Sequence, residues 1–150
     1  MNYTIDASVF ISSARTQEAH HSVSVEFLKQ LRLQQPVVFC PSLILAECSA
    51  AIAGRTGDLV LAQDLVLLVK SFAGMTLYPL PVSLAERATQ IAAAQQLRGA
   101  DAVYVSVAEE SGSTLITWDN EMLKRGPAVV ITVTPANWLL EQQANSSLPS

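Results

Sequence analysis

The chain opens with Met1-Asn2-Tyr3-Thr4-Ile5-Asp6-Ala7-Ser8, a short apolar run that ends on an acid and two small residues. Residues 3–6 are expected to form a strand: before the final Asp6 they are aromatic or β-branched without strict polar alternation, which is typical of a strand buried inside a parallel sheet. Four further runs have the same character, namely residues 37–40, 75–80, 114–117 and 129–133. The sequence therefore predicts a mainly parallel sheet of about five strands.

Helical patterns separate these strands. The expected helices cover residues 17–33, 41–53, 58–72, 83–97, 101–111 and 136–142. Pro41 is expected to start the second of them, and Ser83 with Glu86 is expected to form a capping box at the start of the fourth. Strands alternating with helices favour one three-layer α/β/α domain over residues 1–142, followed by a disordered tail at 143–150.

Length and composition agree with this reading. The 150 residues suit a single core, half of them are hydrophobic, and 15% are charged. No apolar run is long enough to span a bilayer, and the first residues lack signal-peptide character, so a cytoplasmic protein without membrane contact is expected. Cys40 and Cys48 are too few for a disulfide framework and are expected to be buried free thiols.

Four acidic residues stand where ligands commonly bind. In open parallel sheets, ligands bind beyond the carboxyl ends of the strands. Asp6 ends the first expected strand, and Asp119 lies just past the fourth. Glu47 and Asp101 belong to helices that could present them at the same edge. The net charge of −4 argues against nucleic acid at first, but without these four acids the chain is charge-balanced.

Glu47 is the most informative of the four acids. Its neighbours three and four positions away on the expected helix are apolar, and no Lys or Arg lies within one turn. A carboxylate on an apolar face is expected to be neutralised, paired or coordinating a cation. A glutamate at the rim of the apolar stripe, with its side chain in water, is the alternative.

Asp6, Asp101 and Asp119 each precede or open a helical segment, where aspartate is a favoured N-cap, so capping is the alternative for each. Together with Glu47 they exceed what capping requires. Clustered carboxylates raise one another's pKa unless a cation joins them, and oxygen-only ligands favour Mg²⁺ or Mn²⁺. Such a cluster suits metal-dependent phosphodiester hydrolysis.

With these acids the chain resembles the PIN-domain nucleases, and within them the VapC-type toxins of toxin–antitoxin pairs. The resemblance runs from about Asn2 to Trp138 and rests on Ile5-Asp6-Ala7-Ser8, Leu45-Ala46-Glu47, Gly99-Ala100-Asp101-Ala102 and Leu115-Ile116-Thr117-Trp118-Asp119. It implies that the four acids are catalytic metal ligands for Mg²⁺ or Mn²⁺, with Ser8 and Thr117 in support. It also implies single-stranded or structured RNA as the substrate, a homodimer, and a small antitoxin whose tail covers the active site.

Candidate RNA contacts lie near the matched motifs. Trp118 could stack on a base, although a core or rim aromatic is the alternative. Arg55, between two glycines, is a candidate phosphate contact, with a plain solvated arginine as the alternative. The other candidate phosphate contacts are Arg98, Lys124 and Arg125. His20 and His21 are expected to be solvated. The apolar helix at 58–72 could serve an interface or pack in the core.

Three other functions are compatible with an aspartate after the first strand of an α/β domain. A haloacid-dehalogenase-like phosphatase needs a second acid two positions after Asp6, where this chain has Ser8. A receiver-type signalling domain needs paired acids near the end of the first strand, and Asp6 has no acidic neighbour. The remaining rival is a non-catalytic PIN-fold module that binds RNA or acts as a scaffold. The presence of all four acids favours a metal-dependent ribonuclease over this rival.

Overall fold

The computed structural model describes residues 1–149 and contains a five-stranded sheet in the order β3-β2-β1-β4-β5. Every neighbouring pair of strands is parallel. The strands are β1 (Asn2–Ile5), β2 (Val37–Pro41), β3 (Met75–Tyr78), β4 (Thr114–Ile116) and β5 (Thr132–Val133). The strand order reverses between β1 and β4, and a crevice forms beyond the carboxyl ends of strands at such a switch point.

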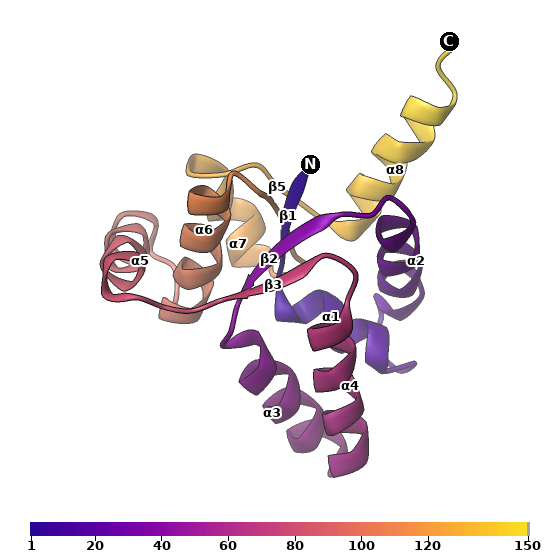
Figure 1. The fold of residues 1–150 in the computed structure, drawn as a ribbon, viewed down its shortest axis with the longest axis horizontal. Coiled ribbons are helices and arrows are strands. Elements are labelled where there is room, and N and C mark those ends of the chain that lie inside the picture. Colours follow the sequence, from indigo (N-terminus) through magenta and orange to yellow (C-terminus); the bar gives the residue numbers. More distant parts are fainter. Residues whose placement is uncertain (150) are drawn as a thin grey trace.

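Helices cover both faces of the sheet, which gives the three-layer α/β/α arrangement that the sequence predicts (Figure 1). The helices are α1 (Ala7–Ala14), α2 (His21–Leu33), α3 (Ile44–Thr56), α4 (Leu59–Ser71), α5 (Val82–Gln95), α6 (Gly99–Ser111), α7 (Asn120–Arg125) and α8 (Pro135–Ser146). Helices α1, α2, α4 and α8 lie on one side of the sheet and α5, α6 and α7 on the other. Helix α3 packs against α1 and α4 beyond the carboxyl ends of the strands.

The centre of the sheet is the core of the molecule. Ile5 of β1 pairs with Ile116 of β4, and neither side chain is accessible to solvent because helices cover both sides. Trp138 of α8 packs edge-on against Phe27 of α2 and donates its indole N–H to the Tyr3 hydroxyl at 3.1 Å. The last helix is thereby fixed to the first strand.

Two start signals read from the sequence are wrong. Pro41 is the last residue of β2 rather than the first of a helix, because the β2–β3 pairing continues through it and Ser42 donates its N–H to Tyr78 O. Ser83 lies inside α5, whose N-cap is Pro81, so the expected capping box does not form. Tertiary pairing and a proline one residue before the helix override these local signals.

Other boundaries shift without changing the topology. The segments after Asp6 and Asp119 form the short helices α1 and α7, and α2 begins at His21 rather than at residue 17. Helix α8 continues to Ser146, so residues 143–146 of the expected disordered tail are helical, and Ser150 lies outside the described residues. Cys40 and Cys48 are buried free thiols, as predicted. Within residues 1–149, no helix combines the length and hydrophobicity needed to cross a bilayer.

Candidate active site

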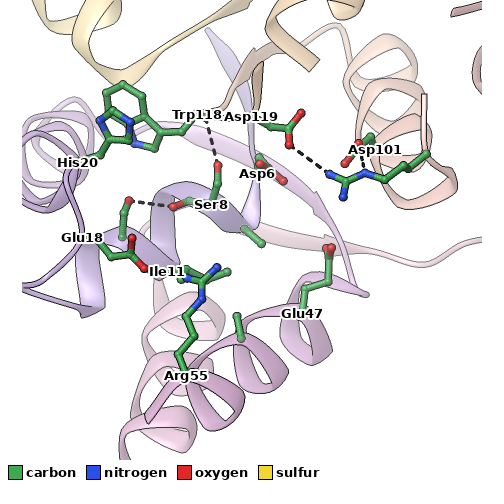
Figure 2. Close-up of a pocket in the computed structure, with 14 residues that line it drawn as sticks. Asp6, Ser8, Ile11, Glu18, His20, Glu47, Arg55, Asp101, Trp118 and Asp119 are labelled. Carbon is green, nitrogen blue, oxygen red and sulfur yellow. Dashed lines mark hydrogen bonds and ion pairs between the residues drawn. The ribbon is translucent and has the colours of Figure 1, made fainter. Parts of the chain in front are cut away.

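All four acids singled out in the sequence line one open groove of about 460 Å³ at the carboxyl edge of the sheet (Figure 2). Asp6 follows β1, and Asp119 lies between β4 and α7. Glu47 projects from the first turn of α3, and Asp101 from the first turn of α6. The switch point between β1 and β4 therefore brings together side chains from four separate segments of the chain.

Asp6 and Asp101 are the two buried acids of the groove. The backbone N–H of Asp6 donates to Ile116 O at 2.9 Å, which extends the β1–β4 ladder, and its Oδ2 accepts the Thr117 hydroxyl at 2.9 Å. Asp6 occupies the N-cap position of α1 but makes no side-chain capping bond. Burial raises the pKa of its carboxyl, the hydroxyls of Ser8 and Thr117 oppose the rise, and the charges of Asp101 and Asp119 add to it. The Asp6 carboxylate therefore lines the groove and does not cap α1.

Asp101 and Asp119 share one arginine. The N-cap of α6 is Arg98, so Asp101 sits inside the first turn and is not the expected cap. The Arg98 Nε donates to Asp101 Oδ2 at 3.1 Å, and its Nη2 donates to Asp119 Oδ2 at 3.2 Å. Burial raises the pKa of Asp101 even though Arg98 opposes the rise. The guanidinium, whose side chain is 75% exposed, acts as a counter-cation between two carboxylates.

Asp119 has two roles at once. Its Oδ1 accepts the Met122 N–H at 2.9 Å, so the capping interpretation is correct for this residue. Its Oδ2 faces the groove and contacts Arg98. Because a carboxylate has two oxygens, a capping aspartate remains available to a cation.

Glu47 is held in the groove by a residue that the sequence analysis did not identify. The buried Tyr104 hydroxyl donates to Glu47 Oε1 at 2.7 Å. Burial raises the pKa of Glu47, the bond from Tyr104 opposes the rise, and the charges of Asp6 and Asp101 add to it. Tyr104 follows Asp101 by three positions on α6, so helical spacing places both residues near one face. That spacing was the available signal.

The donor set fits a hard divalent cation. Among residues 1–149, no three His, Cys, Asp or Glu side chains are already grouped as ligands of one metal ion, and Arg98 lies between two of the acids. The groups facing the groove are nevertheless carboxylate oxygens, which Mg²⁺ and Mn²⁺ prefer. Asp6, Glu47 and Asp101 all have raised pKa values, because burial and neighbouring negative charges disfavour their ionised forms. A bound cation would relieve that cost.

The opposite wall of the groove is aromatic and is lined by Trp118 and His20, whose rings stack (Figure 2). The expectation that His20 is merely solvated is therefore incomplete. Arg55 also lines the groove and donates to Glu18 Oε1 at 2.8 Å. Helix α7 carries the two remaining candidate RNA contacts, Lys124 and Arg125, neither of which lines the groove.

The supporting polar residues lie beside Asp6 and Trp118. Ser8 Oγ accepts the Trp118 backbone N–H at 3.1 Å, which leaves its own hydroxyl proton for Asp6. Thr117 Oγ1 donates to Asp6 and accepts the Asp119 backbone N–H at 2.9 Å. Each hydroxyl therefore links the end of β1 to the segment that follows β4.

The fold and the groove define the class of protein: a small parallel α/β/α domain with a carboxylate-lined site at the edge of its sheet. Within that class, a sequence model of the PIN domain family matches residues 3–127. The chain belongs to the PIN domain family, which confirms the family resemblance. No match was found among curated protein sequences.

Several solved structures share the fold. PAE2754 from Pyrobaculum aerophilum is 24% identical, with 96% of each chain covered and a TM-score of 0.68. VapC20 from Mycobacterium tuberculosis, described as a sarcin–ricin loop cleaving toxin, is 18% identical, with 81% of this chain and 93% of that chain covered and a TM-score of 0.67. VapBC2 from Rickettsia felis, solved with a promoter DNA fragment, is 12% identical, with coverages of 89% and 98% and a TM-score of 0.69.

Proposed function

We propose that this protein is a metal-dependent endoribonuclease that hydrolyses phosphodiester bonds of RNA. The observation that carries the proposal is the convergence of Asp6, Glu47, Asp101 and Asp119 on one groove at the switch point of the sheet. Membership of the PIN domain family supports a nuclease, and the description of VapC20 as a sarcin–ricin loop cleaving toxin supports RNA as the substrate class.

The four acids would hold Mg²⁺ or Mn²⁺, directly or through water. When bound, such an ion supplies positive charge to the phosphate and makes a water molecule easier to deprotonate. Thr117 keeps the Asp6 carboxylate turned into the groove, and Tyr104 does the same for Glu47. Both hydroxyls act as positioning groups, because outer hydrogen bonds fix the orientation of metal-binding carboxylates.

Arg98 is exposed and contacts two of the acids, so it can interact with both the acids and a bound phosphate. Its bonds to Asp101 and Asp119 balance charge while no other cation is near. A guanidinium at this position can also turn to a phosphate oxygen, which it binds with two parallel N–H donors. We assign Arg98 and Arg55 to contacts with RNA phosphates in the groove. Lys124 and Arg125 are assigned to contacts with the RNA on either side of the groove.

We further propose that the protein is the toxin of a type II toxin–antitoxin system, acts in the cytoplasm, forms a homodimer and binds a small antitoxin. Structures that share its fold include VapBC2 and FitAcB from Neisseria gonorrhoeae, the latter at 20% identity and a TM-score of 0.67. Helix α4 supports an interface, because one side packs in the core and the other exposes Leu59, Val60, Leu67 and Leu68. An exposed apolar helix face is a frequent mark of protein–protein contact.

The test is RNA cleavage with purified protein. We expect a panel of RNAs to be cut with Mg²⁺ or Mn²⁺ and left intact with EDTA. Asp6→Asn and Asp101→Asn should abolish cutting while thermal melting shows a folded domain. Glu110→Gln is the matched control, because Glu110 is exposed on the same helix as Asp101 and lies outside the groove. Cleavage by both aspartate variants at the parent rate would refute the catalytic assignment.

A non-catalytic RNA-binding or scaffold module is the second candidate. The observation in its favour is Arg98, which satisfies two of the four acids without any metal ion. A protein of this kind would bind RNA equally well with EDTA, and Mg²⁺ would not raise its melting temperature. Cleavage that depends on Mg²⁺ or Mn²⁺ and on Asp6 excludes it.

A further inference from the structure

Two aromatic rings stack at the rim of the groove, opposite the acids (Figure 2). The His20 imidazole and the Trp118 indole are parallel to within 4°, with 3.8 Å between ring centroids. Trp118 lies between Thr117, which bonds Asp6, and Asp119, which faces the groove. The stacked pair is therefore attached directly to the segment that carries one of the proposed metal ligands.

Two hydrogen bonds fix the orientation of the Trp118 indole. Its Nε1–H donates to Ser24 Oγ at 2.8 Å, and the Trp118 backbone N–H donates to Ser8 Oγ at 3.1 Å. Ser24 is fully buried and shares a hydrogen bond of 2.7 Å with Ser12 Oγ. Both N–H groups of Trp118 are thus used within the protein, so only the faces of its ring remain for further contacts.

The imidazole is the outer ring of the pair. His20 is exposed, whereas Trp118 is half-buried. The described part of the chain contains no hydrogen bond to the His20 side chain, while its backbone oxygen accepts the Ser24 N–H at 2.9 Å. The backbone position of His20 is therefore fixed, and its ring is held by stacking alone. A third flat ring can stack on the pair without breaking a hydrogen bond of the protein.

The charge of the groove makes such a contact useful. The chain carries a net charge of −4, and its groove arginines, Arg55 and Arg98, already contact carboxylates. Most RNA-binding sites draw their affinity from basic residues that replace counterions on the phosphates. Because the acids compete with phosphates for these arginines, a contact that does not depend on charge would add to the affinity. Stacking of bases on aromatic rings is such a contact.

We propose that His20 and Trp118 form a stacking platform for one unpaired nucleobase of the RNA, next to the phosphate that lies at the acids. This inference rests on the proposed ribonuclease function and names the two side chains that would contact the base next to the cut. A paired base in a helix has both faces covered by its neighbours, so it cannot stack on a protein ring unless it leaves the helix. The platform therefore selects unpaired RNA and ranks bases by stacking strength rather than by their hydrogen-bonding edges.

The experiment uses short RNA strands with one mapped cut site and, in turn, a single abasic nucleotide at each position around it. For the parent protein, an abasic nucleotide at one position beside the cut should raise KM by roughly 5- to 100-fold, the range expected for one lost base stack. The same strand annealed to its complement should resist cleavage. His20→Ala should raise KM for the intact strand, and the abasic nucleotide should then add little.

His20→Phe separates stacking from other roles of the imidazole, because it restores a flat ring that cannot titrate or bind phosphate. We expect it to recover most of the parent KM and the sensitivity to the abasic nucleotide. Gln17→Ala is the control, since Gln17 is exposed in the same connection and does not line the groove. It should behave as the parent.

Three results are decisive. If the parent cuts intact and abasic strands with equal KM, the platform is refuted and the ribonuclease proposal stands. If His20→Ala lowers the melting temperature but keeps the full abasic effect, the stack is structural and the inference is wrong. If the parent cuts no strand with Mg²⁺ or Mn²⁺, the proposed function fails and this inference fails with it.

Discussion

The acidic and aromatic ends of the groove differ in how their polar groups are satisfied. At the aromatic end, the indole and backbone N–H groups of Trp118 both have hydroxyl acceptors. At the acidic end, Asp6, Glu47 and Asp101 have raised pKa values because burial and neighbouring charges oppose ionisation. Arg98 reaches two of the four acids and remains exposed. The N–H groups of Trp118 are satisfied within the protein, whereas the four acids have only Arg98 to balance their charge.

This difference indicates that the two ends have different roles. A region whose hydrogen bonds close within the protein holds a fixed shape and can position a substrate. A region of incompletely balanced carboxylates lowers the stability of the empty protein but binds a cation strongly, because the cation removes that cost. Sites of function are commonly destabilised in this way. Variants at each end can therefore show whether the acids destabilise the protein and whether the aromatic end is independent of them.

The largest expected effect is the loss of cleavage in Glu47→Gln. Removing the charge of one proposed ligand should lower the rate at least about a hundredfold, since a bound metal supplies several kcal/mol of charge stabilisation. Single-turnover cleavage at saturating Mg²⁺ measures it. Glu86→Gln, an exposed glutamate on α5 outside the groove, should cleave as the parent does. Equal rates for Glu47→Gln and Glu86→Gln would remove Glu47 from the site.

Asp6→Asn should stabilise the protein in EDTA at neutral pH. Neutralising the carboxyl removes a buried charge opposed by Asp101 and Asp119, and each 1 kcal/mol gained raises the melting temperature by roughly 2–4 °C. Asp6 is a cleaner probe than Asp101, because neutralising Asp101 also removes its ion pair with Arg98. Added Mg²⁺ should stabilise the parent more than the variant. A lower midpoint for Asp6→Asn in EDTA would contradict the clustering of charge.

The gain in Asp6→Asn should depend on pH with a defined sign. The folded-state pKa of Asp6 is raised, so its contribution to stability is fully present below the ordinary carboxyl pKa and is lost as pH rises through the raised value. The parent and the variant should therefore melt at similar temperatures in acid and diverge toward neutral pH. Thermal melts of both proteins from acid to neutral pH, all in EDTA, measure this divergence. A constant difference across the range would contradict it.

Arg98→Ala should bind Mg²⁺ more tightly. The guanidinium competes with a metal ion for Asp101 and Asp119, but it is exposed, so each bond is weak and screened by solvent. We expect the Mg²⁺ concentration that half-saturates thermal stabilisation to fall about two- to fivefold. Arg87→Ala removes an exposed arginine that pairs with Glu109 away from the groove, and it should leave that concentration unchanged. Weaker Mg²⁺ binding in Arg98→Ala would instead assign Arg98 a supporting role.

At the aromatic end, Trp118→Phe should have a small effect on stability and none on metal binding. The variant keeps a ring at the rim and loses the Nε1–H bond to Ser24, while Ser24 keeps its bond to Ser12. Unfolding in urea should show a loss of about 1 kcal/mol, the usual net value of one hydrogen bond. Stabilisation by Mg²⁺ should not change. A change in Mg²⁺ binding would show that the two ends are coupled.

The fold and the four groove acids could be predicted because their signals are local. Buried parallel strands have apolar runs, and acids that follow such strands reach the same edge of the sheet. The same local reasoning failed at Pro41 and Ser83, because strand pairing and the neighbouring Pro81 decided those boundaries. The capping interpretation is correct for Asp119, which caps its helix, and wrong for Asp6, which makes no capping bond.

The sequence by itself determined the α/β alternation, the position of Asp6 and Asp119 after strands, and the placement of Asp101 at the start of a helix. Only the tertiary structure decided that Tyr104 bonds Glu47, that Arg98 bridges two acids, and that His20 covers Trp118. The physical reason is the range of the interactions. Strand and helix patterns depend on neighbours along the chain, whereas these contacts join different elements that meet only when the sheet is assembled.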